Sequence, residues 1–261
     1  MLPILYWNSA ALFLALLALA GVSLELGHWL GLRLRPRYDE RVVDQLGSIQ
    51  AGVLGTLGIL LGFVLSIVLL QFIERRDLVV READAIGTAY IRAQFLEEPE
   101  REEVRAILRR YIQLRLEIFE SRGTGEAQNA RFEAAVEACR DLQGRLWDAA
   151  LRATQKDSRP ILNLFVDTVN EVIDLDTHRY AAWRHHVPRL VLDVLIVFAI
   201  VSLGMMSFVS ATRCAQRVGA WYLLGGLLCM LLLVIVDLDR PRLGWIPVDH
   251  DAMEYEARGM E

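Results

Sequence analysis

The sequence predicts an all-α membrane protein with four transmembrane helices in two pairs and a helical insert between the second and third helices. Hydrophobic residues make up 54% of the 261 residues, although 23% are charged. The charged residues avoid four apolar segments, each near or above the ~18 residues that suggest a membrane-spanning helix. Between the second and third segments, a long polar stretch repeats its apolar residues at helical spacing. These observations together predict the fold class.

The first two apolar segments place transmembrane helices 1 and 2 within residues 1–73. The first segment covers about residues 3–32. It has no basic residue before it and no small-residue cleavage site that stands out, so we expect a retained helix rather than a secretion signal. The second segment covers about residues 47–73. No helix breaker lies between Phe72 and Ala85, so we expect this helix to continue beyond the membrane.

Residues 74–187 are predicted to form an extramembrane helical stalk or bundle. After Pro99, apolar residues recur on one face of a predicted helix: Val104, Ile107, Leu108, Tyr111, Leu114 and Ile118. We expect a break at Gly123–Gly125 and a new helix start at Ser158. The helical spacing of apolar residues resumes after each of these points, so the whole insert is expected to be helical.

Transmembrane helices 3 and 4 are predicted within residues 188–237, and residues 238–261 are predicted to be a short C-terminal tail. Pro188 is expected to kink the chain where the third spanning helix begins. Arginines in the two short loops place those loops in the cytoplasm by the positive-inside rule, with the insert outside. Other arginines flank the membrane on the insert side. The sequence therefore leaves open which side of the membrane holds the insert.

One run of the second segment combines an absence of charge with a regular pattern of small residues. No charged residue lies between Asp44 and Glu74, and the small residues recur there at steps that keep them on one helix face. Such a face either packs closely on another helix or lines a conduit, with an apolar constriction. The sequence leaves both possibilities open. The candidate residues for pore lining or helix packing are Gly55, Ile59, Gly62, Phe63 and Ser66.

Titratable residues near the ends of the spanning helices are candidates for the mouth of a pore. Glu25 and His28 are one turn apart near the end of helix 1. Inside the membrane this pair would suggest proton or ion handling, whereas at the interface it would need no such role. Asp237 and Asp239 end helix 4, where an acidic pair could concentrate cations. The alternative is that this pair ends the helix and binds a following arginine.

Polar residues on the extension of the second helix and on the last insert helix are expected to form a network inside the bundle. They are Arg81, Asp84, Arg92, Asn170, Asp174 and Arg179. The last insert helix also carries a stripe of acidic residues ending at His178, a combination that could bind a divalent ion. A single helix supplies too few converging ligands, so we expect a solvated or salt-bridged face and no metal.

Several segments carry a family resemblance: Gly58–Ser66, Arg75–Arg76, Glu82–Arg92, Asn170–Asp174 with Arg179, and Asp237–Pro241. They resemble the bestrophin-like domain-of-unknown-function family of bacterial membrane proteins. A more distant similarity to the bestrophins themselves rests on the helix plan and on the stretch Leu61–Phe63. Bestrophins are pentameric ion channels, mostly for anions, with apolar constrictions on the second helix. The resemblance therefore implies a channel, while the calcium clasp of bestrophins is not recognisable.

The expected protein is a multi-pass homo-oligomer of the bacterial cytoplasmic (inner) membrane, and the resemblance favours a pentamer. We expect inorganic ions to pass through a pore lined by the second helix. The alternative is a non-conducting membrane scaffold or sensor whose insert binds a partner or ligand. The sequence has no nucleophile motif, phosphate loop or paired histidine motif, so we expect neither an enzyme nor a cofactor. Its net charge of -5 does not indicate nucleic acid binding.

Overall fold

The computed structural model describes residues 8–121, 126–156, 159–214, 219–240 and 244–260, and all regular elements within these ranges are helices. The predicted break at Gly123–Gly125 and the predicted start at Ser158 lie outside the described residues. The chain divides into two compact units. Unit 1 comprises Met1–Leu70 and His186–Ile246, and unit 2 comprises Gln71–His185 and Pro247–Glu261.

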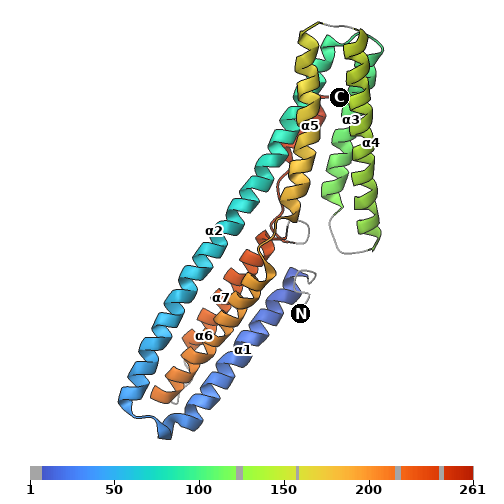
Figure 1. Ribbon diagram of the computed structural model, residues 1–261. Helices are drawn as coiled ribbons and strands as arrows, with labels where there is room; N and C mark the ends of the chain where they lie inside the picture. Colours follow the sequence, from blue (N-terminus) through green and yellow to red (C-terminus); the bar gives the residue numbers. More distant parts are fainter. Residues whose placement is uncertain (1–7, 122–125, 157–158, 215–218, 241–243, 261) are drawn as a thin grey trace. The chain divides into compact units, whose positions relative to one another are not determined.

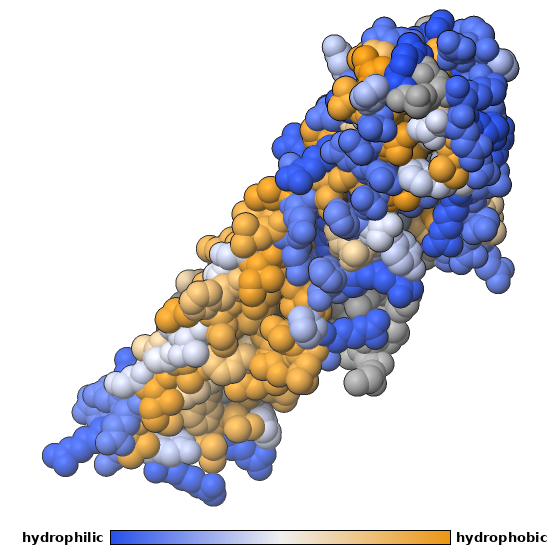
Figure 2. Space-filling model, turned by 45° about the horizontal axis from the view of Figure 1, so that its top comes forward, coloured by the Kyte–Doolittle hydropathy of each residue, from blue (hydrophilic) through white to orange (hydrophobic). Residues whose placement is uncertain are grey.

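Unit 1 contains the apolar helices (Figure 1). They are α1 (Ser9–Leu34), the first part of α2 (Glu40–Arg92), α6 (Arg189–Arg213) and α7 (Gly219–Leu238), with the 3-10 turn η2 (Arg35–Arg37) after α1. Among the described residues, four helical segments are long and apolar enough to cross a membrane, and these helices account for the apolar parts of those segments. Figure 2 shows a broad band of hydrophobic residues on the visible surface of this unit. Such a surface suits contact with lipid.

Small residues bring the backbones of α1 and α6 into contact. A Cβ atom added to Gly27 would lie 2.1 Å from the carbonyl oxygen of Gly204. One turn further along α1, a Cβ atom added to Gly31 would lie 2.5 Å from the carbonyl oxygen of Phe208. No side chain tolerates such distances, so glycine is required at both positions of α1. Interfaces built on small residues are common between membrane helices because they allow this close approach.

We expect Gly27→Ala to lower the free energy of unfolding by about 1–3 kcal/mol, because the added methyl group would push α1 away from α6. Gly21→Ala is the matched control, since Gly21 lies on the same helix with nothing within 4 Å of an added Cβ. Thermal unfolding of the full-length protein in detergent micelles compares the two variants. Equal melting temperatures would contradict the close contact.

The helix α2 is uninterrupted from Glu40 to Arg92 and contributes to both units. This confirms that the second spanning helix continues into the insert without a break. The chain does break before the third spanning helix, since α5 ends at Arg184 and α6 begins at Arg189. The prediction of a kink at Pro188 is therefore wrong, because the structure has a break between two helices at this point. Proline has no backbone N–H and disfavours helical geometry in the residue before it, so the helix ends instead of bending.

Unit 2 is a helical bundle with its own hydrophobic core. It consists of the second part of α2, η3 (Ala93–Phe95), α3 (Glu100–Glu120), α4 (Glu126–Lys156), α5 (Ile161–Arg184) and α8 (Asp251–Gly259). The helix α3 packs on α4 and α8, and α4 packs on α5. The apolar face predicted after Pro99 is buried in this core, including Val104, Leu108 and Tyr111.

The last part of the chain folds with the insert helices. The sequence predicts residues 238–261 to be a short tail, whereas the structure places the described residues from Pro247 onward in unit 2. The side chain of Met253 in α8 is fully buried, and Met260 is buried after it. Two methionines give too weak an apolar pattern to reveal a packed helix in the sequence, because such a short helix depends on its partners for stability.

Candidate functional site

The face of α2 that carries Gly55, Ile59, Gly62, Phe63 and Ser66 is exposed in the subunit. We call these residues the open face of α2. The side chains of Ile59 and Phe63 are 63% and 67% exposed, and nothing lies within 4 Å of a Cβ added at Gly55 or Gly62. Ser66 satisfies its hydroxyl group by donating to Gly62 O at 2.9 Å. The open face therefore makes no close helix contact within the described part of its own subunit.

The opposite face of α2 provides the packing within unit 1. Leu57, Leu61, Val64 and Val68 are buried, and their spacing places them about half a turn away from the open face. Among the described residues, no helix of the same subunit packs closely on the open face, and the choice between packing on a helix of another subunit and lining a conduit stays a prediction. What remains for this face is lipid, another subunit or a conduit.

The acidic pair at the end of α7 is buried and hydrogen-bonded. The Asp237 carboxylate accepts from Ser9 Oγ at 2.6 Å and from the Ile246 backbone N–H at 2.9 Å. The Asp239 side chain, which is 0% exposed, accepts from the Val187 N–H at 2.9 Å. Within one subunit, these carboxylates hold the start of α1, the start of α6 and the segment after α7 together. A role at a pore mouth stays a prediction for both residues.

The other candidate pair lies on α1. Tyr222 of α7 donates its hydroxyl proton to the Glu25 carboxylate at 2.5 Å, so Glu25 connects two helices of unit 1. His28 is partly exposed one turn further along α1. A role of these two residues in handling ions also stays a prediction.

The six polar residues predicted to form a network in the insert separate into two groups. Arg92 of α2 donates to Leu164 O at 2.7 Å, and Arg179 of α5 donates to a carboxylate of α2, so these two connect α2 and α5. The others lie at the surface of unit 2. Arg81 pairs with Asp77 on its own helix at 2.8 Å. Exposed positions are also occupied by Asp84, Asn170 and Asp174.

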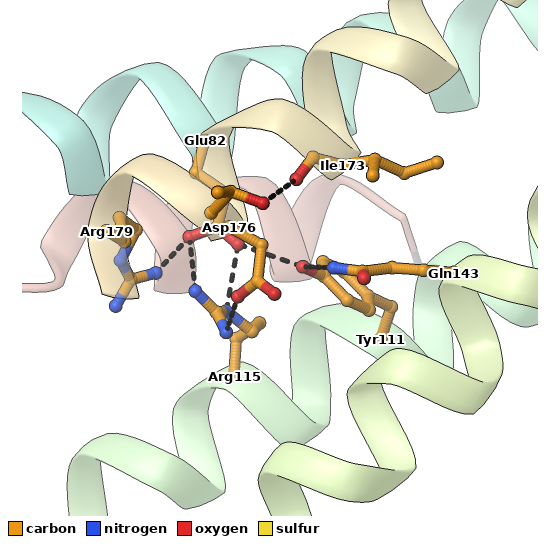
Figure 3. Close-up of polar contacts among 8 residues, drawn as sticks. Glu82, Tyr111, Arg115, Gln143, Ile173, Asp176 and Arg179 are labelled. Carbon is orange, nitrogen blue, oxygen red and sulfur yellow. Dashed lines mark hydrogen bonds and ion pairs between the residues drawn. The ribbon is translucent and has the colours of Figure 1, made fainter. Parts of the chain in front are cut away.

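The partner of Arg179 is Glu82, which lies at the centre of a buried charged cluster (Figure 3). Its side chain is 0% exposed. Two guanidinium groups point toward the Glu82 carboxylate, from Arg115 of α3 and Arg179 of α5. Arg115 contacts its two oxygens at 2.8 and 3.0 Å and also binds Asp176 at 2.6 Å. We call these four residues together with Tyr111, whose hydroxyl donates to Glu82 at 3.1 Å, the Glu82 cluster.

The two arginines keep Glu82 ionised. Burial alone would raise the pKa of the Glu82 carboxyl, but the charges of Arg115 and Arg179 together lower it below its ordinary value. Burial raises the pKa of the Tyr111 hydroxyl well above its ordinary value, so Tyr111 stays a neutral donor. Two carboxylates and two guanidinium groups give the cluster no net charge. A fully paired cluster of this kind stabilises one arrangement of α2, α3 and α5.

The described residues contain no recognisable metal site, and the Cys139 thiol is not activated. No group of three or more His, Cys, Asp or Glu side chains among them is placed to hold a metal ion. Burial raises the pKa of the Cys139 thiol to about 11. A thiol with such a pKa is protonated at neutral pH and is a poor nucleophile.

Comparison with known proteins identifies the family. A family model described as the Bestrophin-like domain matches residues 11–253, which is most of the chain. The chain belongs to the Bestrophin-like family. No curated protein matches the sequence of this Bestrophin-like chain. The resemblance inferred from the sequence is thereby confirmed.

Solved structures share the fold of this Bestrophin-like chain. A bacterial Bestrophin homolog from Klebsiella pneumoniae matches with a TM-score of 0.63 at 15% identity, covering 92% of this chain and 96% of that chain. A point mutant of that homolog matches with a TM-score of 0.65 at 15% identity, covering 94% and 96%. A structure described as a membrane protein matches with a TM-score of 0.65 at 13% identity, covering 95% of both chains. Identities this low establish the fold alone.

Sequence reasoning about this Bestrophin-like chain missed Glu82, Arg115 and Asp176. A signal for two of them was present. Arg115 lies four residues after Tyr111 and three before Ile118, so it falls on the apolar face of α3. Glu82 lies three residues after Val79 and four before Ile86, so it falls on the apolar face of α2. A charged residue at a core position of an amphipathic helix indicates a buried ion pair, because an unpaired buried charge is too unfavourable to persist.

Proposed function

We propose that this Bestrophin-like chain is one subunit of a homo-oligomeric ion channel of the bacterial inner membrane, with α2 of each subunit lining the pore. The observation that carries the proposal is the open face of α2, which is exposed along an apolar helix of a membrane protein. Family membership supports a channel, and the resemblance to bestrophins favours five subunits. The partners are then other copies of the chain, the lipid bilayer and inorganic ions.

A closed ring of identical subunits brings the same face of every α2 to one axis. Gly55, Gly62 and Ser66 leave room for hydrated ions near the backbone of such a pore. Ile59 and Phe63, which extend furthest from the same face, narrow it to an apolar constriction that gates by excluding water. The buried opposite face of α2 keeps the helix packed on its own subunit while the open face lines the pore.

Planar-bilayer recording of the purified protein tests this proposal. We expect ion conductance from the wild type and a severalfold larger conductance from Phe63→Ala, because the substitution removes one ring per subunit from the constriction. Leu223→Ala on α7 is the matched control, since Leu223 is also 67% exposed but lies outside the open face. The control is expected to conduct like the wild type.

An absence of conductance at every voltage, salt concentration and pH would overturn the channel proposal. It would favour the alternative, a non-conducting scaffold or sensor whose insert binds a partner or ligand. That alternative has one specific observation in its favour, a cavity in unit 2 lined by charged side chains. A larger effect from Leu223→Ala than from Phe63→Ala would instead leave the channel but remove α2 from its pore.

A further inference from the structure

Unit 2 contains a cavity of about 400 Å³ between α3, α4 and α5, and its lining includes no residue of the open face of α2. Its volume lies in the range of small-molecule sites, which combine an apolar wall with a few converging polar groups. The polar lining includes Arg115, Arg140, Gln143, Asp176 and Arg179, and the apolar wall includes Trp183. All of these residues belong to unit 2 and to described helices.

The lining of the cavity has an excess of positive charge. Arg115, Arg140 and Arg179 contribute three cationic groups, against the single carboxylate of Asp176. Glu82 lies behind the lining with 0% exposure and does not face the cavity. Arg115 already binds both carboxylates of the Glu82 cluster. Glu82 and Asp176 together balance the charges of Arg115 and Arg179, so the positive charge that the lining leaves for an anion is that of Arg140.

Arg179 is the buried group with hydrogen-bonding capacity to spare. Its Nη1 donates to Glu82, and this is the one acceptor that its five N–H groups have among the described residues. Its guanidinium group also lies over the Phe119 ring, 4.8 Å from the centroid. Burial, followed by repulsion from Arg115, lowers the pKa of Arg179. A second carboxylate near Arg179 would relieve this repulsion and accept from the remaining donors.

The other end of the cavity provides an exposed cation and a flat apolar surface. Arg140 is exposed, and its ion pair among the described residues is with Glu137 of the same helix at 3.6 Å, which is a weak surface pair. The Trp183 ring packs against the Phe132 ring with their centroids 5.3 Å apart, and this contact restricts the movement of Trp183. A fixed aromatic ring beside two guanidinium groups suits a planar ligand that carries negative charge.

We propose that this cavity binds a small organic anion, with its carboxylate held by Arg140 and Arg179 and its flat apolar body against Trp183. The ligand class follows from the exposed charge of Arg140, the spare donors of Arg179 and the aromatic wall. The site lies outside the residues proposed to line the pore, so binding is measured independently of ion conduction.

Isothermal titration calorimetry of the full-length protein in detergent micelles, with benzoate as the probe, tests the proposal. We expect saturable binding of benzoate and none of benzamide, which has the same shape without the charge. Arg140→Gln is expected to weaken benzoate binding about tenfold, the effect of losing one hydrogen bond to a charged group. Arg145→Gln is the matched control, because Arg145 is exposed on the same helix and does not line the cavity.

Trp183→Leu tests the apolar wall and is also expected to weaken binding. Equal affinities in the Arg140→Gln and Arg145→Gln variants would overturn the site, and both variants change exposed side chains that folding does not require. Phosphate binding as tightly as benzoate, without any effect of Trp183→Leu, would overturn the assignment to an organic anion. Binding of benzoate by a protein that fails to conduct would support the site and refute the channel separately.

Discussion

Replacing Glu82 by glutamine is expected to destabilise unit 2 by about 3–5 kcal/mol, the typical effect of removing one partner from a buried ion pair. The substitution keeps the size of the side chain but leaves Arg179 without its carboxylate and Arg115 with Asp176 alone. Both guanidinium groups remain buried. Most of the expected loss is therefore the unfavourable burial of positive charge that nothing neutralises.

Hydrogen exchange of the amides of α3 and α5, followed by mass spectrometry on the full-length protein in detergent micelles, measures this effect locally. Glu133→Gln is the matched control, because Glu133 is exposed on α4, and it is expected to leave exchange unchanged. Adding Arg179→Met to Glu82→Gln should recover part of the loss, since it removes one uncompensated charge. Slow, wild-type exchange in Glu82→Gln would contradict a stabilising role for the cluster.

The stability difference between the wild type and Glu82→Gln is expected to shrink as the pH falls. The pKa of Glu82 is lowered in the folded protein, so the unfolded state binds a proton at this residue more readily than the folded state does. The contribution of the carboxylate is fully present above the unfolded pKa of about 4.3 and is lost as the pH falls through the lower folded value. Below that value, wild-type Glu82 is neutral, as glutamine is.

Melting temperatures of the two full-length proteins, measured from neutral pH down to about pH 3, test this expectation. Other carboxylates also titrate in this range, but they are common to both proteins and cancel in the difference. A melting-temperature difference that stays constant down to the lowest pH would show that the charge of Glu82 does not stabilise the fold.

The apolar helices could be predicted from the sequence because their signal is local. A long uncharged run such as that between Asp44 and Glu74 identifies a spanning helix without knowledge of its neighbours. The continuity of α2 followed equally from the residues themselves, since nothing after Phe72 breaks the helix. The family resemblance was available for the same reason, because it rests on contiguous segments.

The structural role of each glycine could not be predicted from the sequence, because it depends on which residues of another helix pack against that glycine. The spacing of Gly55 and Gly62 indicates a packing or pore-lining face, yet no atom of the described residues lies within 4 Å of a Cβ added to either glycine. Gly27 and Gly31 lie in a helix with many small residues and gave no distinct signal, although Gly204 and its neighbours on α6 pack directly on them. The helix that packs on these two glycines is more than a hundred residues away in the chain, and a single sequence does not indicate which distant helix that is.

The Glu82 cluster could not be predicted from the sequence, because its residues come from helices that are distant in the chain. The sequence predicts that Arg179 bonds to the helix over residues 81–92, and its partner Glu82 lies in that range. The acidic candidate proposed there, Asp84, is two residues from Glu82 and therefore lies on the opposite, exposed face of α2. The cluster draws on three helices at once, α2, α3 and α5. Helical periodicity assigns Glu82 and Arg115 to buried faces, and only the packing of those faces brings the charges together.

The contacts of α1 impose an order on the synthesis of this protein. The partners of α1 are α6 and α7, and the hydrogen bond from Ser9 to Asp237 joins residues 228 positions apart. At about 5–20 residues per second, translation separates these two residues by on the order of 10–50 s. Until α6 has been made, the glycine face of α1 lacks the partner that it contacts in the folded subunit. The ribosome therefore has to synthesise α6 and α7 before α1 can take its final place.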